Sequence, residues 1–341
     1  MFKQKQLLLG MAFMLGLTPA MVSAGQEVNL YSARKEKLIK PLLDKFSSRT
    51  GIKVNLVTGK ADALLKKLQS EGINSPADIL LTTDAGRLHR AKSAGVTQPF
   101  FSDKLKKAIP SQYRDASGHW YGLSLRARPI MYVKGRVNPS ELSTYEALAD
   151  SKWKRRICIR SSSNIYNQSL IASMISANGE KATENWAKKF VKNFARPPKG
   201  GDRDQIKGAA SGQCDIAVAN TYYLAGMLNS KDKKQRSAAN KVAVFWPNQN
   251  GRGAHVNVSG AALTKSAKNR HNAVKLIEFL AEPESQLWYA QKNGEYPARP
   301  GVKMSSTLLS WGKFKADNLN LVNLGTLNPK AVMLMDRSGW K

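Results

Sequence analysis

The stretch "ADILLTTDAGRLHRAKSAG", residues 77–95, decides the fold class. Residues 77–84 form an apolar run of strand length, and residues 85–95 carry apolar side chains at helical spacing. Other strand-like runs lie at 28–33, 52–59, 155–160, 214–220 and 241–247. Helical stretches follow most of them. This alternation favours α/β architecture with a mostly parallel sheet and helices on both faces.

Two α/β lobes are expected, because 341 residues exceed what one compact core usually supports. Residues 120–135 alternate apolar and polar side chains around Pro129, which is typical of a strand that connects two lobes. A second connection is predicted at 257–269. The predicted lobes comprise 25–123 with about 258–300, and 124–257 with about 301–341. Since open α/β sheets bind ligands beyond the carboxyl ends of their strands, we expect a ligand cleft between the lobes.

The N-terminal residues have the pattern of a secretory signal peptide. Lys3 and Lys5 precede an apolar run at 7–17, and small residues at 22–24 provide a cleavage site. The run is shorter than the roughly 20 apolar residues that a membrane-spanning helix needs. We therefore expect residues 1–24 to be removed and the chain to be exported, without stable insertion into a membrane.

Two cysteines, Cys158 and Cys214, remain in the exported chain, each in or beside a predicted strand. An oxidising compartment favours a disulfide between them, which would join neighbouring strands of one lobe. Two buried free thiols are the alternative. A metal site is disfavoured, because no histidine or third cysteine lies nearby at ligand spacing.

Charge and motifs exclude several function classes. Lys and Arg number 54 against 24 Asp and Glu, giving a formal charge of +30, but the basic residues are scattered and do not form a stripe with interleaved aromatic residues. Nucleic-acid binding is therefore disfavoured. The sequence has no phosphate-binding lysine loop, G-x-S-x-G elbow, dinucleotide fingerprint or H-E-x-x-H motif, and its four histidines stand apart. We do not expect an enzyme.

Three tyrosines occupy equivalent positions at predicted strand-to-helix junctions. Tyr222 and Tyr223 follow the strand at 214–220, and Tyr166 follows the strand at 155–160 and a cap-rich turn. Ionised phenols are hard oxygen donors, and only a strongly acidic cation could remove the proton of a group that titrates near pH 10. Ferric iron fits these donors best. Packing of aromatic rings at helix starts remains an alternative.

Five ordered stretches carry a resemblance to a known family: "NLYSARKEKLIKPLLDKF", "SPADILLTTDAGRLHRA", "WYGLSLRARPIMYVK", "RRICIRSSSNIYNQSLIASMI" and "CDIAVANTYYLAGM". The chain resembles the ferric-iron-binding periplasmic proteins of bacterial ABC uptake systems, from about residue 28 to the C-terminus. The resemblance implies a type II periplasmic binding fold, with crossing hinge strands between the two lobes. It also implies Fe(III) ligation by Tyr166, Tyr222 and Tyr223, and a periplasmic monomer that delivers iron to an inner-membrane permease and its ATPase.

The chain departs from many of its relatives after the "YSAR" segment. They carry His-Tyr where this chain has Lys35 and Glu36. The departure is similar to the branch that uses only the three tyrosines and completes the iron shell with a small anion such as carbonate or bicarbonate. Arg34 and Arg126 are the candidate anion-binding residues, because a guanidinium holds a carboxylate-like anion by two hydrogen bonds. Glu36 is an additional candidate metal ligand.

The alternative function from the same residues is a carrier of a small anion, such as phosphate, a phosphonate or a carboxylate, without iron. Such a carrier would use the arginines and helix N-termini. It would not need three convergent phenols.

Overall fold

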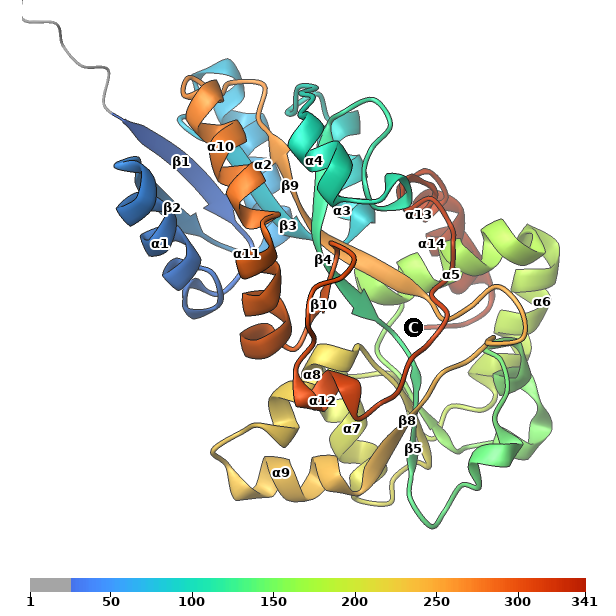
Figure 1. Ribbon diagram of the computed structural model, residues 1–341. Helices are drawn as coiled ribbons and strands as arrows, with labels where there is room; N and C mark the ends of the chain where they lie inside the picture. The colour runs from blue at the N-terminus through green and yellow to red at the C-terminus, as the bar shows by residue number, and fades with distance from the viewer. Residues whose placement is uncertain (1–25) are drawn as a thin grey trace, which may run out of the picture.

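The computed structural model describes residues 26–341; the predicted signal peptide lies outside the described residues. The chain forms two lobes, each with its own β-sheet (Figure 1). The first sheet has the order β10 (Tyr296–Pro297), β4 (Trp120–Ala127), β9 (Val256–Leu263), β3 (Ile79–Thr83), β1 (Glu27–Ser32), β2 (Lys53–Thr58). The second has the order β6 (Ile157–Cys158), β7 (Ile216–Val218), β5 (Ile130–Val133), β8 (Val242–Phe245).

Helices surround both sheets. Those of the first lobe are α1 (Lys40–Thr50), α2 (Ala61–Glu71), α3 (Ala85–Ser93), α4 (Asp103–Ala108), α10 (Arg270–Leu280) and α11 (Pro283–Trp288). Those of the second lobe are α5 (Ile165–Asn178), α6 (Glu180–Val191), α7 (Asp202–Ala210), α8 (Thr221–Leu228) and α9 (Lys233–Asn240). The chain ends with α12 (Ser306–Leu309), α13 (Val322–Thr326) and α14 (Asn328–Arg337). Within residues 26–341, no helix is long and apolar enough to span a membrane.

The stretch at 77–95 folds as its pattern predicts. It forms β3 in the interior of the first sheet, between β9 and β1, and then α3. Asp84 caps α3 by accepting a hydrogen bond from the backbone N–H of Gly86 at 2.9 Å. Leu88 and Ala91 are buried on the inner face of α3, as helical spacing requires.

The sheets are mixed, so the expectation of mostly parallel sheets is wrong. Among the named strands of residues 26–341, parallel pairing is limited to β1 with β2 and β3, and to β6 with β7. The strands β4, β9 and β10 of the first sheet, and β5 and β8 of the second, pair antiparallel. The reason is that β4, β5, β8 and β9 belong to connections between lobes, which have no crossover helix to return them parallel to their neighbours.

Two extended connections join the lobes, as predicted. Strand β4 belongs to the first sheet and β5, which begins three residues later, to the second; β8 and β9 connect the sheets in the opposite direction. All of β9 is buried. The two-lobe α/β fold with crossing strands is thereby confirmed, while the residue boundaries of the lobes stay a prediction.

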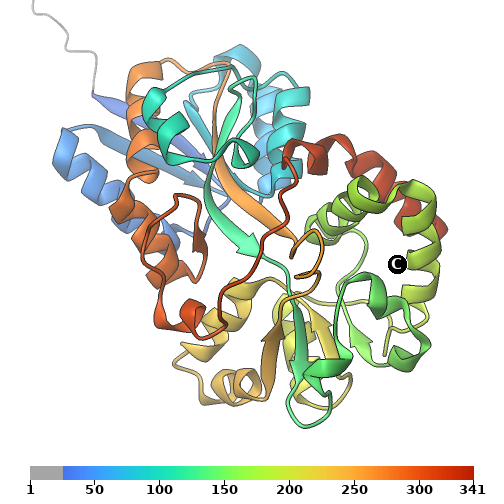
Figure 2. The ribbon, with the colours of Figure 1, turned by 45° about the vertical axis from the view of Figure 1, so that its right-hand side comes forward.

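The C-terminal segment makes a third passage between the lobes. After β10 it reaches the second lobe, where the Trp246 and Phe314 rings stack with centroids 3.9 Å apart. It then packs α13 against both α3 and α5, and α14 against α5 and α6. A side chain at Gly325 would overlap His89, so α13 lies directly on α3. Figure 2 shows this red segment running past the hinge strands.

A disulfide joins Cys158 and Cys214, with Cα atoms 5.9 Å apart, which confirms the predicted pairing. Cys158 lies in β6, and Cys214 lies two residues before the adjacent parallel strand β7.

Removing the disulfide with a Cys158→Ser, Cys214→Ser variant is expected to lower the free energy of unfolding by roughly 2–4 kcal/mol, because the bond closes a long loop in the unfolded chain. Thermal unfolding with and without reductant checks this: reductant should destabilise the parent chain and leave the variant unchanged. An unaltered parent would contradict it.

Candidate metal centre

The three tyrosines lie together in the second lobe. Tyr166 occupies the first turn of α5, where the Asn164 side chain accepts a hydrogen bond from its backbone N–H at 3.2 Å. Tyr222 and Tyr223 occupy the first turn of α8. The Tyr222 hydroxyl donates to the Tyr166 hydroxyl at 3.3 Å, and the Tyr222 and Tyr223 rings lie 4.2 Å apart between centroids. All three side chains are half-buried.

The local order of the chain explains this convergence. Strands β6 and β7 are parallel neighbours, so the turns at their carboxyl ends meet at one edge of the sheet. Helices α5 and α8 start from these turns, and the disulfide links the last residue of β6 to the segment that leads into β7. The sequence pattern therefore places the tyrosines correctly relative to one another.

Arg126 of β4 comes from the first lobe and faces the phenols. Its guanidinium carbon lies 5.3 Å from the Tyr166 ring centroid and 5.9 Å from that of Tyr222. Nη2 donates to the backbone oxygen of Val258 at 2.5 Å, whereas Nε and Nη1 are buried and have no hydrogen-bond partner within residues 26–341. Unpaired buried donors of a cation are costly, and a bound anion would satisfy them.

The phenols differ in acidity. Burial would raise the pKa of Tyr166, but the Arg126 charge and the hydrogen bond from Tyr222 outweigh it and hold that pKa below its ordinary value. Burial raises the pKa of Tyr222 well above its ordinary value, and negative charge on Tyr166 and Tyr223 raises it further. Burial, followed by negative charge on Tyr166, raises the pKa of Tyr223 to about 12. Tyr166 is thus the phenol most readily ionised before a metal arrives.

A buried carboxylate organises the charges behind the tyrosines. Asp202, at the start of α7, pairs with Arg128 at 3.1 Å and with Arg160 at 3.5 Å. Arg128 also donates to the side-chain oxygens of Asn167 and Asn220, so it ties the crossing connection to α5 and to the N-terminus of α8. The Arg160 guanidinium carbon lies 5.6 Å from the Tyr166 ring centroid.

Asp202 and Arg160 were not predicted as site residues. Arg160 could have been predicted from its position, since it ends the strand-like run at 155–160 that leads to Tyr166. No local pattern predicts Asp202 as a site residue, because its partner Arg128 lies 74 residues away.

Arg34, the second candidate for the anion, is already paired. Its Nη2 lies 2.6 Å from the Glu295 carboxylate and 2.8 Å from the Ser124 hydroxyl, and its guanidinium carbon lies 5.0 Å from the Tyr289 ring centroid. The pair is buried, with side-chain exposures of 3% for Arg34 and 6% for Glu295. Glu295 was not predicted, because no sequence pattern links positions 261 residues apart.

Replacing Glu295 with alanine is expected to lower the free energy of unfolding by about 3–5 kcal/mol, because it leaves the Arg34 charge buried and unpaired. Denaturant unfolding of the iron-free protein measures this. Asp44→Ala is the matched control, since it breaks the exposed Lys40–Asp44 pair and should leave the unfolding midpoint nearly unchanged. Equal effects of the two substitutions would contradict the prediction.

Glu36, the additional candidate ligand, is exposed in a 3₁₀ turn, Glu36–Leu38. Among residues 26–341, no hydrogen bond or ion pair joins it to the tyrosines. The structure therefore brings Arg126 to the rings of Tyr166 and Tyr222, and within the described residues no hydrogen bond or ion pair joins Glu36 to the three phenols.

The two lobes are in contact beside the tyrosines. The Ser169 hydroxyl of α5 donates to Asp84 of the first lobe at 2.7 Å, and Asn257 of β9 donates to the other Asp84 oxygen at 2.9 Å. Burial raises the pKa of the Asp84 carboxyl. A polar contact between lobes thus lies one helical turn beyond Tyr166 on α5.

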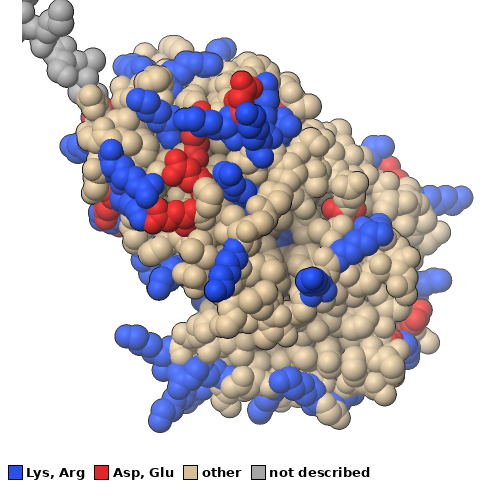
Figure 3. Space-filling model, viewed as in Figure 1, with Lys and Arg blue, Asp and Glu red and all other residues tan. Residues whose placement is uncertain are grey.

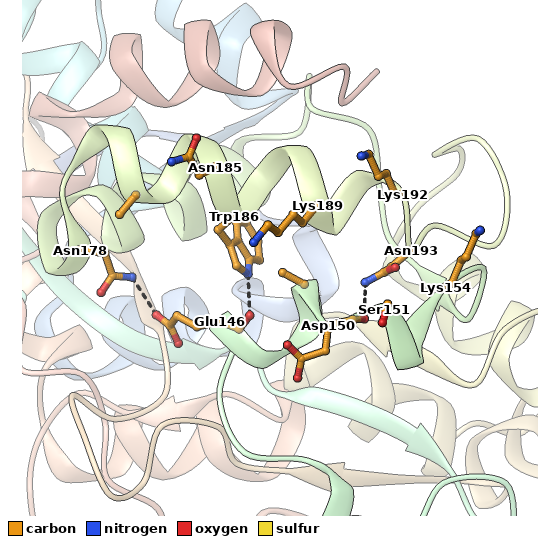
Figure 4. A pocket seen from close by; sticks show the side chains of 12 residues that line it. Glu146, Asp150, Ser151, Lys154, Asn178, Asn185, Trp186, Lys189, Lys192 and Asn193 are labelled. Atoms are coloured by element: carbon orange, nitrogen blue, oxygen red, sulfur yellow. Dashed lines mark hydrogen bonds between the residues drawn. The ribbon is translucent and has the colours of Figure 1, made fainter.

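A separate hollow of about 1090 Å³ lies where α6 faces the turns at 146–153 (Figure 4). None of the predicted site residues lines it. Some of its polar side chains are hydrogen-bonded within the protein: the Trp186 indole donates to the backbone oxygen of Tyr145 at 3.0 Å, and Asn178 donates to Glu146 at 2.9 Å. This hollow offers no phenol and is not the candidate metal centre.

The described residues contain no group of three or more His, Cys, Asp or Glu side chains that could hold a metal ion. The clustered phenol oxygens are therefore the candidate metal ligands of this site. Phenolates suit a hard, highly charged cation better than they suit Zn²⁺, which prefers nitrogen and sulfur.

Two lobes with crossing strands, and candidate binding groups supplied by both, define a solute-binding protein. The chain belongs to the bacterial extracellular solute-binding protein family, which its sequence matches over residues 42–316. Membership confirms the expectation of a binding protein and not an enzyme.

Individual relatives agree with the resemblance seen in the sequence. Iron uptake protein A1 of Synechocystis sp. is 52% identical over 316 residues, which are 93% of this chain and 88% of that protein. The structure of Trichodesmium IdiA (FutA) in complex with iron and citrate ligands has a TM-score of 0.91 at 52% identity, covering 92% of this chain and 100% of that one. Mannheimia haemolytica ferric iron-binding protein A in an open conformation has a TM-score of 0.86 at 39% identity, covering 92% and 98%.

Proposed function

We propose that this protein captures ferric iron in the periplasm with the phenolates of Tyr166, Tyr222 and Tyr223. A small anion held by Arg126 completes the iron shell. The observation that carries the proposal is the convergence of three phenols, two of which, Tyr166 and Tyr222, face an arginine whose Nε and Nη1 have no hydrogen-bond partner among the described residues. The iron-binding relatives support the choice of metal.

Charge balance favours Fe(III) with an anion. Three phenolates neutralise a 3+ ion and leave coordination positions open, and an anion in those positions adds negative charge that Arg126 offsets. We propose carbonate or bicarbonate as the anion. The relative with iron and citrate makes citrate the alternative co-ligand. Arg34 would reach the anion only by sharing its Glu295 and Ser124 contacts, so its part is the smaller one.

Delivery of iron to a transporter is the second part of the proposed function. The loaded, closed protein would dock on an inner-membrane permease driven by an ATPase and release iron there as a monomer. Export by the predicted signal peptide places the protein in the periplasm. Opening of the lobes withdraws Arg126 from the phenols, which removes the anion's support and favours release.

A visible-absorption titration tests the proposal. Iron-stripped protein is titrated with chelated Fe(III) in bicarbonate, in citrate and without either, alongside Arg126→Gln. A phenolate-to-iron absorption band that requires an added anion, and that needs far more of it in the variant, is the expected result. A protein that stays colourless at saturating iron would overturn the proposal. Binding of phosphate by such a protein would favour the anion carrier that the two arginines also suit.

A further inference from the structure

Four exposed lysines surround a shallow hollow of about 430 Å³ on the second lobe, between α7 and α9. We call it the α7–α9 hollow. Its basic residues are Lys207, Lys233, Lys234 and Lys241. Its other lining residues are small, namely Ala210, Ser211, Ser237 and Ala238. Small residues between long cationic side chains let a charged group approach several ammonium groups at once.

The four lysines form no ion pair with any of the residues that the structure describes. Among the ion pairs within residues 26–341, none involves any of the four, and the single recorded hydrogen bond from their ammonium groups runs from Lys241 to the backbone oxygen of Ala210 at 3.4 Å. Some lysines on other faces are paired, for example Lys67 with Glu71 and Lys92 with Asp115. The α7–α9 hollow presents an excess of positive charge, and the nearby Asp232 carboxylate, whose pKa the Lys207 charge helps to lower, offsets only part of it.

The acidic residues at 196–241 form their hydrogen bonds and ion pairs with groups other than the lysine side chains of the hollow. Residues 196–241 contain nine Lys and Arg but only four Asp. Asp202 pairs with Arg128 and Arg160, and Asp215 pairs with Arg136 and Arg156. Asp204 accepts from the backbone N–H of Gly201 and Asp232 from that of Lys234, so both serve as helix caps. None of the four forms an ion pair with a lysine of the hollow within the described residues.

The position of α9 leaves this charge free to meet a large partner. Helix α9 lies at the outer edge of the second lobe, away from the first lobe, in both ribbon views. Figure 3 shows basic side chains over α9 along the lower left margin, with no acidic side chain among them in that view. The tyrosines lie in the first turns of α5 and α8, where Tyr166 and Tyr222 face Arg126.

We propose that the α7–α9 hollow is a docking surface for the anionic headgroups of a lipid bilayer. Juxtamembrane lysines each strengthen binding to an anionic surface by about fivefold, and the attraction falls off within a Debye length. An acidic protein is the less suitable partner, because protein interfaces are built around aromatic, Met and Arg side chains and are depleted in Lys. The hollow contains none of the favoured types.

This surface answers the question that the charge of +30 raises for a carrier of a cation. The positive charge attracts the protein to an anionic bilayer, near the permease, and does not serve to attract bare Fe(III). Because the hollow shares no residue with the candidate metal centre, docking and iron binding are separable.

Vesicle co-sedimentation tests the proposal. The mature protein is mixed with vesicles of equal parts phosphatidylglycerol and phosphatidylcholine, or of phosphatidylcholine alone, at low and high salt. The test variant replaces Lys207, Lys233, Lys234 and Lys241 with glutamine. The matched control replaces four exposed lysines of the first lobe that also lack ion pairs among the described residues, Lys37, Lys53, Lys60 and Lys66, so that both variants lose the same charge.

We expect salt-sensitive binding of the parent chain to the anionic vesicles only. The test variant should bind at least about tenfold more weakly than the matched control, and both should take up iron as the parent does. Equal losses in the two variants would overturn the proposal, because net charge and not the hollow would then determine binding. If the parent protein binds polyglutamate but not the vesicles, the proposal is wrong and an acidic protein partner is favoured. If the parent protein binds neither, the proposal is also wrong.

Discussion

Replacing Tyr222 with phenylalanine is expected to lower the affinity for Fe(III) by at least about a thousandfold. The substitution removes one hydroxyl, which is both a proposed ligand and the donor to the Tyr166 hydroxyl. Loss of an outer-shell partner of a metal ligand typically costs 10–100-fold in metal affinity, and loss of a ligand itself should cost more. The buried ring of phenylalanine keeps the packing against Tyr223, so the fold should survive.

Competition with a coloured chelator measures this affinity, and the phenolate-to-iron band reports the ligand set. Tyr132→Phe is the matched control: Tyr132 is a half-buried tyrosine of β5, outside the cluster. It should bind iron as the parent does. If Tyr222→Phe keeps the parent affinity and the parent spectrum, Tyr222 is a packing residue and the proposed ligand set is wrong.

Acidification is the second change with a large expected effect. The raised pKa values of Tyr222 and Tyr223 keep both phenols protonated at neutral pH in the iron-free protein. Iron binding must then release at least two protons, and a third wherever Tyr166 is protonated. The apparent affinity should therefore fall by about a hundredfold to a thousandfold for each pH unit of acidification. The lowered pKa of Tyr166 places this residue last among the three to regain its proton.

Protons released on addition of Fe(III) can be counted in weak buffer with a pH indicator, after correction for the iron chelate alone. Tyr222→Phe should release about one proton fewer whenever it is loaded at high iron. An affinity that is constant from mildly acidic to mildly alkaline pH would show that the phenols do not ionise on binding, and would remove them as ligands.

Local sequence patterns predicted the tyrosine cluster because each of its determinants is short-range. A strand, a turn and a first-turn tyrosine follow one another at 155–166 and again at 214–223. The remaining step, that β6 and β7 are neighbours, was supplied by the two cysteines. Where a site is built from repeated local units and one cross-link, the sequence contains nearly all of the information.

Long-range contacts were outside the reach of such patterns. The Glu295 partner of Arg34, the Asp202 partner of Arg128 and the Asp84 contact with Ser169 each join segments more than seventy residues apart. The prediction of parallel strands was wrong for the same reason. Alternating strands and helices predict parallel pairing within one lobe, but strands that pass between lobes enter each sheet from the opposite end.

The third passage of the chain between the lobes has a consequence for the entropy of closure. Two strands alone would let an open form sample many relative orientations, and closing over iron would have to select one of them at a cost in free energy. The added contacts of α13 with α3 and α5 restrict that set before any ligand arrives. Less of the binding energy is then consumed in selecting the closed form, so more of it is expressed as affinity.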